Sequence, residues 1–193
     1  MLIPVYYTLR GILYTLYTVL MFLTPDHLVK ELYLKPGDRA ADIGCGTGAY
    51  TIALSEEVGE MGQVYAVDVH RDALHTLAGA LDKRSITNVE MIWVDIEKGI
   101  PIDAYSLDAV VMSNILFQLD DISAALNYVA KLLKPEGELL VVDWTGSHGG
   151  IGPHKDHVVS EEKIIDLVQK HGFRMLKRLH AGDYHYAFIA LST

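Results

Sequence analysis

Cysteine and basic residues are both scarce in this sequence, and each scarcity excludes a class of protein. Cys45 is the only cysteine among 193 residues, so no internal disulfide can form and the chain suits a reducing compartment, the cytoplasm. Lys and Arg number 16 against 25 Asp and Glu, which gives a formal net charge of -9. Proteins that follow a nucleic-acid backbone depend on clustered Lys and Arg, so we expect no nucleic-acid partner.

A hydrophobic run long enough to cross a bilayer is also missing. Residues 1–24 are apolar along most of their length, but Arg10 and Asp26 bracket an uncharged stretch well under the roughly 20 apolar residues that a span needs. The basic start and small-residue cleavage site of a signal peptide are absent too. A helix that is apolar nearly all round must be buried, so we expect residues 1–24 to pack on the domain, as a lid or in a homodimer contact. Contact with a membrane surface is the alternative.

Residues 25–193 contain short apolar runs that alternate with helical patterns, and no repeat, low-complexity tract or linker divides them. Near-continuous apolar strands separated by helices are typical of a parallel sheet covered on both faces. The short connection between the last two strands predicts an antiparallel hairpin instead. We therefore expect one α/β domain over residues 25–193. The predicted strands cover residues 39–43, 63–68, 89–95, 107–112, 138–144, 173–179 and 184–191, and the predicted helices cover 25–34, 50–58, 71–81, 121–133 and 160–171.

A glycine turn joins the first of these strands to the helix that follows it. The turn runs from Asp42 to Gly48 in the order Asp-Ile-Gly-Cys-Gly-Thr-Gly. Glycine permits positive φ and close approach of a ligand to the main chain, while the start of a helix offers free N–H groups and a positive dipole end. A strand, a glycine turn and a helix in this order predict a ligand cradle. With Asp68 about 20 positions on, the turn also fits the dinucleotide fingerprint, so NAD stays open on this observation alone.

Carboxylates at the ends of the predicted strands favour a ligand other than NAD. Asp42, Asp68 and Asp95 end the first three strands, so a parallel sheet would bring them to one edge. A carboxylate two residues before the first glycine would repel a pyrophosphate but suit an amino group and a sulfonium cation. S-adenosylmethionine is a phosphate-free nucleoside with two ribose hydroxyls, an exocyclic amine and a cationic tail. Its groups match three carboxylates and a glycine turn.

From about Thr24 to its C-terminus, the chain resembles the class I S-adenosylmethionine-dependent methyltransferases. The residues that carry the resemblance are, in motif order, Asp42 to Gly48, Asp68, Trp93 to Ile96, Ser113 with Asn114, Leu133 to Gly137, and Leu140 to Trp144. The resemblance implies a Rossmann-like, seven-stranded, mostly parallel sheet of order 3-2-1-4-5-7-6. Strand 7 would be antiparallel, and helices would cover both faces.

The resemblance also implies how S-adenosyl-L-methionine is bound. Asp68, followed by Val69, would hold the ribose hydroxyls, and Asp95 would hold the adenine amine with help from the Ile96 backbone. Gly44 and Gly46 would hold the methionine portion, and Asp42 would set the electrostatics near its amino group and sulfonium. The cofactor-binding residues expected in all are Asp42, Gly44, Cys45, Gly46, Gly48, Asp68, Val69, Asp95, Ile96, Ser113 and Asn114.

A loop rich in glycine and histidine follows the fifth predicted strand, at the same edge as the cradle. Methyl transfer needs mainly alignment and exclusion of water, so a general base is optional. The candidates for one are His148, His154, His157, His185 and Asp143. His154 and His157, with His185 near, also suggest a metal site, but nothing else completes a ligand set and we expect none. Metal-dependent O-methyltransferases of this fold carry an acidic residue after strand four, where this chain has Asn114.

The methyl acceptor is outlined only coarsely by the sequence. An apolar, tyrosine-rich N-terminus and the lack of a basic surface favour a small apolar or amphipathic acceptor, such as a lipid or a quinone. A protein or tRNA substrate is the alternative within the same class of enzyme. Outside that class, the alternatives are an NAD-dependent oxidoreductase and a cofactor-binding regulatory module without catalysis.

Overall fold

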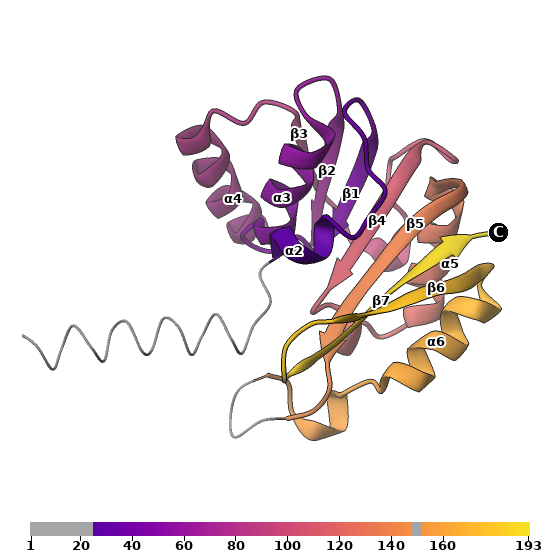
Figure 1. Cartoon of the computed structure of the whole chain (residues 1–193). Coiled ribbons are helices and arrows are strands. Elements are labelled where there is room, and N and C mark those ends of the chain that lie inside the picture. Colours follow the sequence, from indigo (N-terminus) through magenta and orange to yellow (C-terminus); the bar gives the residue numbers. More distant parts are fainter. Residues whose placement is uncertain (1–24, 148–151) are drawn as a thin grey trace, which may run out of the picture.

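The chain forms a seven-stranded sheet between two layers of helices (Figure 1), and a computed structural model describes residues 25–147 and 152–193 of it. The expectations about residues 1–24 and about His148 lie outside the described residues. The strands are β1 (Arg39–Ile43), β2 (Gln63–Asp68), β3 (Val89–Trp93), β4 (Leu107–Ser113), β5 (Leu133–Trp144), β6 (Phe173–His180) and β7 (His185–Ser192). Their order is β3-β2-β1-β4-β5-β7-β6, and β7 runs antiparallel to both of its neighbours. The strand order and the reversed strand that the resemblance implies are thus confirmed.

Helices cover both faces of the sheet. They are α2 (Pro25–Val29), α3 (Ala49–Val58), α4 (Arg71–Arg84), α5 (Ile122–Leu132) and α6 (Glu161–Lys170), with short 3-10 helices η1 (Ile96–Lys98), η2 (Leu116–Gln118) and η3 (Lys155–His157). Ala40 and Ala41 are neighbours in β1, yet they belong to different core clusters, because successive side chains point to opposite faces. One face packs against α2, α3 and α4, and the other packs against α5 and α6. β4, the middle strand of the sheet, is therefore apolar without interruption over residues 109–112.

Two helices begin where local capping residues predict. Asp121 caps α5, because its side chain accepts a hydrogen bond from Ala124 N at 3.0 Å. Ser160 caps α6 in the same way, through Lys163 N. Among the helices of the described ranges, none has the length and apolar character to cross a membrane.

Two element boundaries differ from the sequence-based expectation by five residues, more than any of the others. The first helix ends at Val29 rather than at residue 34, and the chain leaves it through bonds of the tighter 3-10 type, such as that from Leu32 N to Val29 O. Leu32 is still buried, so the helical spacing of apolar residues continues beyond Val29 although the helix ends there. β5 begins at Leu133 rather than at residue 138, since Leu133 pairs with Leu107 before residues 134–137 bulge out of the ladder.

Candidate functional site

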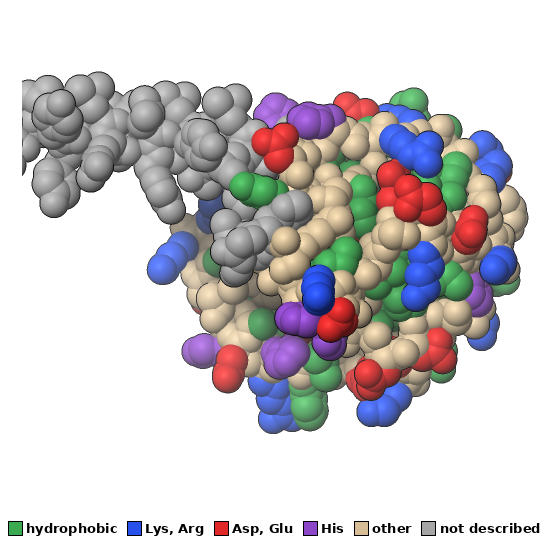
Figure 2. Space-filling view, turned by 90° about the horizontal axis from the view of Figure 1, so that it is seen from below, with side chains coloured by type: hydrophobic (Ala, Val, Ile, Leu, Met, Phe, Trp, Pro, Cys, Tyr) green, Lys and Arg blue, Asp and Glu red, His purple; other side chains and the backbone are tan. Residues whose placement is uncertain are grey.

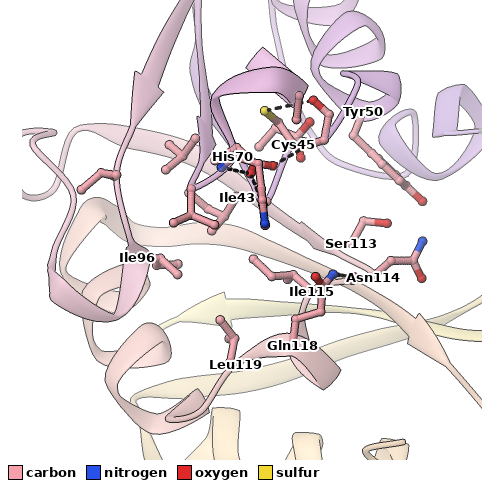
Figure 3. Close-up of a pocket in the computed structure, with 18 of the residues that line it drawn as sticks. Ile43, Cys45, Tyr50, His70, Ile96, Ser113, Asn114, Ile115, Gln118 and Leu119 are labelled. Atoms are coloured by element: carbon pink, nitrogen blue, oxygen red, sulfur yellow. Dashed lines mark hydrogen bonds and ion pairs between the residues drawn. The ribbon is translucent and has the colours of Figure 1, made fainter. Parts of the chain in front are cut away.

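The carboxyl ends of β1, β2 and β4 border a cavity of about 520 Å³. β2 and β4 lie on either side of β1, so the cavity lies where the strand order reverses, the usual ligand position in open α/β sheets. Figure 1 shows β4 and β5 pointing to the lower end of the molecule, and Figure 2 looks at that end, where several histidine side chains lie at the surface. All of the expected cofactor-binding residues except Gly48 line this cavity (Figure 3).

The three glycines of the turn have different roles, although all three have positive φ. A Cβ built at Gly46 meets no atom of the described part of the chain within 4 Å. At Gly44 a Cβ would overlap Ile115, and at Gly48 it would overlap Leu77 of α4. Gly44 and Gly48 are therefore required by packing against side chains of the protein itself, whereas Gly46 is the position that leaves the main chain open to a ligand.

Asp42 is a buried carboxylate that lines the cavity. Thr51 Oγ1, from α3, donates a hydrogen bond to Asp42 Oδ2 at 2.6 Å. Burial raises the pKa of Asp42 to about 6; the hydrogen bond from Thr51 opposes this rise, and the negative charge of Asp68 adds to it. A cation in the cavity would favour the charged form, so this carboxylate is suited to a positively charged ligand.

Replacing Asp42 by Asn is expected to stabilise the free protein at pH 8. Because the folded-state pKa is raised, the folded protein binds a proton more tightly than the unfolded chain, and stability falls as the pH rises from 3.8 to about 6. The Asn variant lacks this loss, so its free energy of unfolding should exceed that of the wild type by about 1 to 3 kcal/mol at pH 8, and the advantage should shrink toward pH 4. Urea unfolding at both pH values measures it, and an advantage that does not depend on pH would contradict the prediction.

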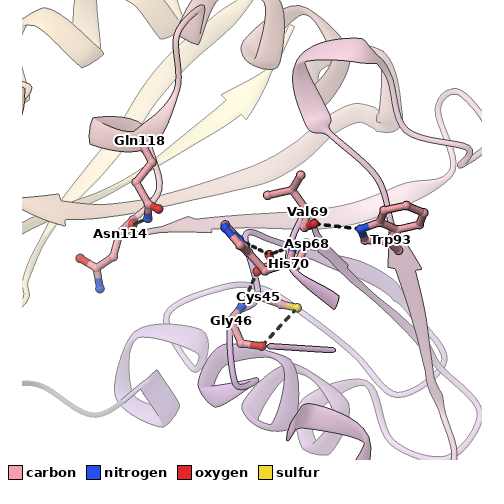
Figure 4. A network of polar contacts seen from close by, with 8 residues as sticks. All are labelled: Cys45, Gly46, Asp68, Val69, His70, Trp93, Asn114 and Gln118. Carbon is pink, nitrogen blue, oxygen red and sulfur yellow. Dashed lines mark hydrogen bonds and ion pairs between the residues drawn. The ribbon is translucent and has the colours of Figure 1, made fainter. Parts of the chain in front are cut away.

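Asp68 ends β2 and links the two loops that border the cavity. Its Oδ2 accepts a hydrogen bond from Gly46 N at 2.8 Å, and its Oδ1 accepts one from His70 N at 2.8 Å. The His70 ring lies beside the same oxygen, with Nδ1 at 3.2 Å (Figure 4). The carboxylate is 8% exposed and lines the cavity, so donors from both loops fix its orientation at the ligand-facing edge.

Asp95 follows β3 and caps η1. Its Oδ1 accepts a hydrogen bond from Glu97 N at 3.0 Å, and its Oδ2 lies 2.8 Å from Lys98 Nζ. The hydrogen bonds from Lys98 and from the Glu97 backbone hold the pKa of Asp95 below its usual range. Ile96 is buried beside it. All three strand-end carboxylates thus line one cavity, as the parallel order of the strands predicts.

The opposite wall of the cavity comes from the segment after β4. Asn114 has a left-handed backbone, with φ of 54°, and its buried Oδ1 has no hydrogen-bond partner among the described residues. Gln118 Nε2 donates a hydrogen bond to the Asn114 carbonyl at 2.8 Å, which closes the segment on itself. Tyr50 extends from the start of α3 toward Ser113 and Asn114 (Figure 3), and burial raises the pKa of its hydroxyl to about 12. This wall therefore offers polar groups to a bound molecule, next to the apolar Ile115.

The candidate bases among the described residues do not line this cavity. Asp143 is buried and binds backbone N–H groups. His185 packs against Trp144, with 4.3 Å between the ring centroids. His154 lies in an exposed loop, and His157 borders a separate groove. Within the ranges that the structure describes, no three His, Cys, Asp or Glu side chains are grouped so that they could hold a metal ion. A role for these groups in proton transfer stays a prediction.

Sequence reasoning missed five polar residues that line the cavity, namely Thr47, Tyr50, His70, Glu97 and Gln118, of which three are instructive. His70 lies two residues beyond the end of β2, so the rule that ligands bind outside strand ends could have identified it. Gln118 belongs to the segment after β4 and could have been identified in the same way. Tyr50 offers no such signal, because an aromatic residue in the first turn of a helix is more often part of the core.

Comparison with known proteins identifies relatives of this chain. The family model described as a methyltransferase domain matches residues 34–175, well over half of the sequence. The chain is 32% identical over 117 residues to a demethylmenaquinone methyltransferase of Staphylococcus epidermidis, a match that covers 61% of this chain and 47% of that protein. Its identity to a protein of the same name from Bacillus mycoides is 29% over 141 residues, which covers 71% of this chain and 57% of the relative. The chain thus spans about half the length of the curated relatives it matches.

Solved structures agree with the family model over a longer stretch. The crystal structure of a SAM-dependent methyltransferase from Aquifex aeolicus superposes with a TM-score of 0.82 at 28% sequence identity. The match covers 91% of this chain and 92% of that one, so it includes the whole sheet order and not only the glycine turn. On the match to residues 34–175, the chain belongs to the methyltransferase-domain family.

Proposed function

We propose that this chain transfers a methyl group from S-adenosylmethionine to a small, quinone-like acceptor. The observation that carries the cofactor assignment is the convergence of Asp42, Asp68 and Asp95 on one cavity, beside the open position at Gly46. Asp42, beside the glycine turn, would repel the phosphates of a dinucleotide, whereas S-adenosylmethionine has no phosphate and carries a positive charge. The cavity therefore fits this cofactor better than NAD.

The protein's part in the reaction is to bind, to orient and to exclude water, because the sulfonium of S-adenosylmethionine already activates the methyl group. Asp68, fixed by backbone N–H groups, would accept hydrogen bonds from the ribose hydroxyls. Asp95 would accept one from the adenine amine, next to Ile96. Buried Asp42 would face the positive charge, and the open main chain at Gly46 would admit the methionine portion.

The acceptor assignment is supported by the relatives and by the cavity wall after β4. Two matching proteins are named demethylmenaquinone methyltransferases. In this wall polar Gln118 lines the cavity together with apolar Ile115 and Leu119, and Tyr50 of α3 extends toward Ser113 and Asn114 (Figure 3). An aromatic ring that bears oxygen atoms matches a mixed wall of this kind. The homodimer and the membrane-surface contact through residues 1–24 remain predictions from the sequence.

Isothermal titration calorimetry with the full chain tests the cofactor. We expect S-adenosylmethionine and its demethylated product, S-adenosylhomocysteine, to bind, and we expect NAD to give no heat. Asp42 is the physical reason for this preference, because its buried carboxylate beside the glycine turn favours the cation and disfavours the pyrophosphate. Binding of NAD without binding of either sulfur compound would overturn the assignment.

A transfer assay with methyl-labelled S-adenosylmethionine tests the acceptor. Reduced demethylated naphthoquinones are offered together with bulk protein and tRNA, so that the acceptors compete in one reaction. We expect the label in the quinone fraction. Label in protein or tRNA would keep the cofactor assignment and overturn the acceptor assignment.

A further inference from the structure

Asp143, one of the candidate bases, is engaged with main chain rather than with the cavity. It is 2% exposed and does not line the cavity. Its Oδ2 accepts a hydrogen bond from Leu116 N at 2.9 Å, and its Oδ1 accepts one from Trp144 N at 2.8 Å. Burial raises the pKa of Asp143 to about 6, while these two bonds oppose the rise. Both carboxylate oxygens thus hold backbone N–H groups.

The bond to Leu116 connects Asp143 to the wall of the cavity. Leu116 begins η2, and Ile115 and Leu119 on either side of η2 line the cavity. The Leu116 side chain packs into the hydrophobic core, whereas its neighbours Ile115 and Leu119 line the cavity. Asp143 lies 27 residues further along the chain, which makes this bond a tertiary anchor rather than a local turn.

We propose that Asp143 is a positioning residue for the methyl acceptor: through Leu116 it fixes residues 115–119, the part of the wall that follows the expected cofactor-binding residues Ser113 and Asn114, without touching acceptor or cofactor. The inference rests on the proposed function, in which the cofactor lies along the three strand-end carboxylates and the acceptor lies against the opposite wall. Those carboxylates end β1, end β2 and follow β3, and the hydrogen bonds of Asp143 reach none of them. Loss of this anchor should therefore weaken acceptor binding and leave cofactor binding largely intact.

The residue opposite Asp143 in the sheet has a comparable contact. Tyr186 of β7 pairs with Asp143 in register, and its hydroxyl donates a hydrogen bond to Val159 O at 3.1 Å. Val159 lies just before α6. Two adjacent side chains at the end of the sheet thus each hold a different segment of main chain. A carboxylate is well suited to this task, because hydrogen bonds to a charged acceptor are about twice as strong as neutral ones.

Three single variants of the full chain test the proposal, namely Asp143→Leu, Asp143→Asn and Asp108→Asn. The Leu variant removes both acceptor oxygens at similar volume, and the Asn variant keeps one. Asp108 is the matched control, because it also accepts a backbone hydrogen bond, from Arg39 N at 2.9 Å, but near the start of β4, at the other end of the sheet. The readouts are the KM for the reduced quinone, the Kd for S-adenosylhomocysteine and the amide hydrogen exchange of Leu116.

For Asp143→Leu we expect the KM for the acceptor to rise about tenfold or more, since small displacements of a positioning wall are costly, while the Kd for S-adenosylhomocysteine changes by less than about twofold. Asp143→Asn should rescue much of the effect, with a rise of about threefold, because one acceptor oxygen remains. The Leu116 amide should lose exchange protection in the Leu variant and keep part of it in the Asn variant. Asp108→Asn should change neither the KM nor the exchange of Leu116.

An unchanged KM in Asp143→Leu, or a raised KM with the Leu116 amide still protected, would overturn the proposal. Equal losses of acceptor and cofactor binding, without rescue by Asn, would also contradict it, because Asp143 would then support the fold as a whole. The wild-type chain tests the proposed function separately from the variants. If the proposed function is wrong, the wild-type chain will bind no S-adenosylhomocysteine or will methylate no quinone.

Discussion

Replacing Asp68 by Ala is expected to lower the affinity for S-adenosylhomocysteine by about 100-fold or more, because two losses coincide, each worth about tenfold or more. The ribose hydroxyls lose their charged acceptor. In addition, Gly46 N and His70 N lose the partner that they share, which releases the two loops that border the cavity. Calorimetric titration of wild type and variant measures the ratio of the two dissociation constants.

Two further variants separate these losses. Asp68→Asn keeps one acceptor oxygen at the same place, so its affinity should fall by about tenfold, between the wild type and Asp68→Ala. Asp72→Ala removes the same charge from an exposed position in the first turn of α4 and should leave the affinity unchanged. If Asp68→Ala bound the ligand as tightly as Asp72→Ala, the assignment of Asp68 to the ribose would be wrong.

Much of the fold could be predicted because its signals are local. The apolar strands follow from a sheet that is covered on both faces, and Asp121 and Ser160 mark the starts of two helices. The end of α2 could not be predicted. Leu28 and Leu32 are both buried, and their spacing is the same whether the chain between them is helical throughout or turns away after Val29. Apolar spacing reports burial, whereas the end of a helix depends on backbone hydrogen bonds that the spacing does not encode.

In the candidate site, too, the features that depend on local sequence could be predicted, and those that depend on tertiary contacts could not. Three carboxylates could be placed at one edge, because a strand end is a local feature and parallel strands align their ends. The different roles of the glycines could not be predicted, since they depend on Leu77 and Ile115, which come from other elements. The same holds for Asp143, an acidic residue near a strand end whose partner, Leu116, lies 27 residues away.

Gly48→Ala is expected to lower the free energy of unfolding by about 2 to 5 kcal/mol, as the sum of a backbone and a packing effect. The φ of Gly48 is 91°, and holding an Ala in left-handed conformation costs about 1–2 kcal/mol. The added Cβ would overlap the fully buried Leu77, and overpacking of this kind costs about 1–3 kcal/mol. In a chain of this length, the loss corresponds to a fall in Tm of about 5 to 15 °C, which thermal unfolding measures.

Gly46→Ala is the matched variant, and we expect it to lower the affinity for the ligand more than it lowers the stability of the fold. Its φ of 52° is in the left-handed region at a cost of about 1–2 kcal/mol, and its Cβ would meet no atom of residues 25–147 or 152–193 within 4 Å, so the loss of stability should be the smaller of the two. The same Cβ would enter the cavity beside the N–H that binds Asp68, so the affinity for S-adenosylhomocysteine should fall by about tenfold or more. Wild-type affinity in Gly46→Ala would mean that no ligand approaches the turn. Its glycines would then serve packing alone, and the carboxylates would have to account for the cofactor by themselves.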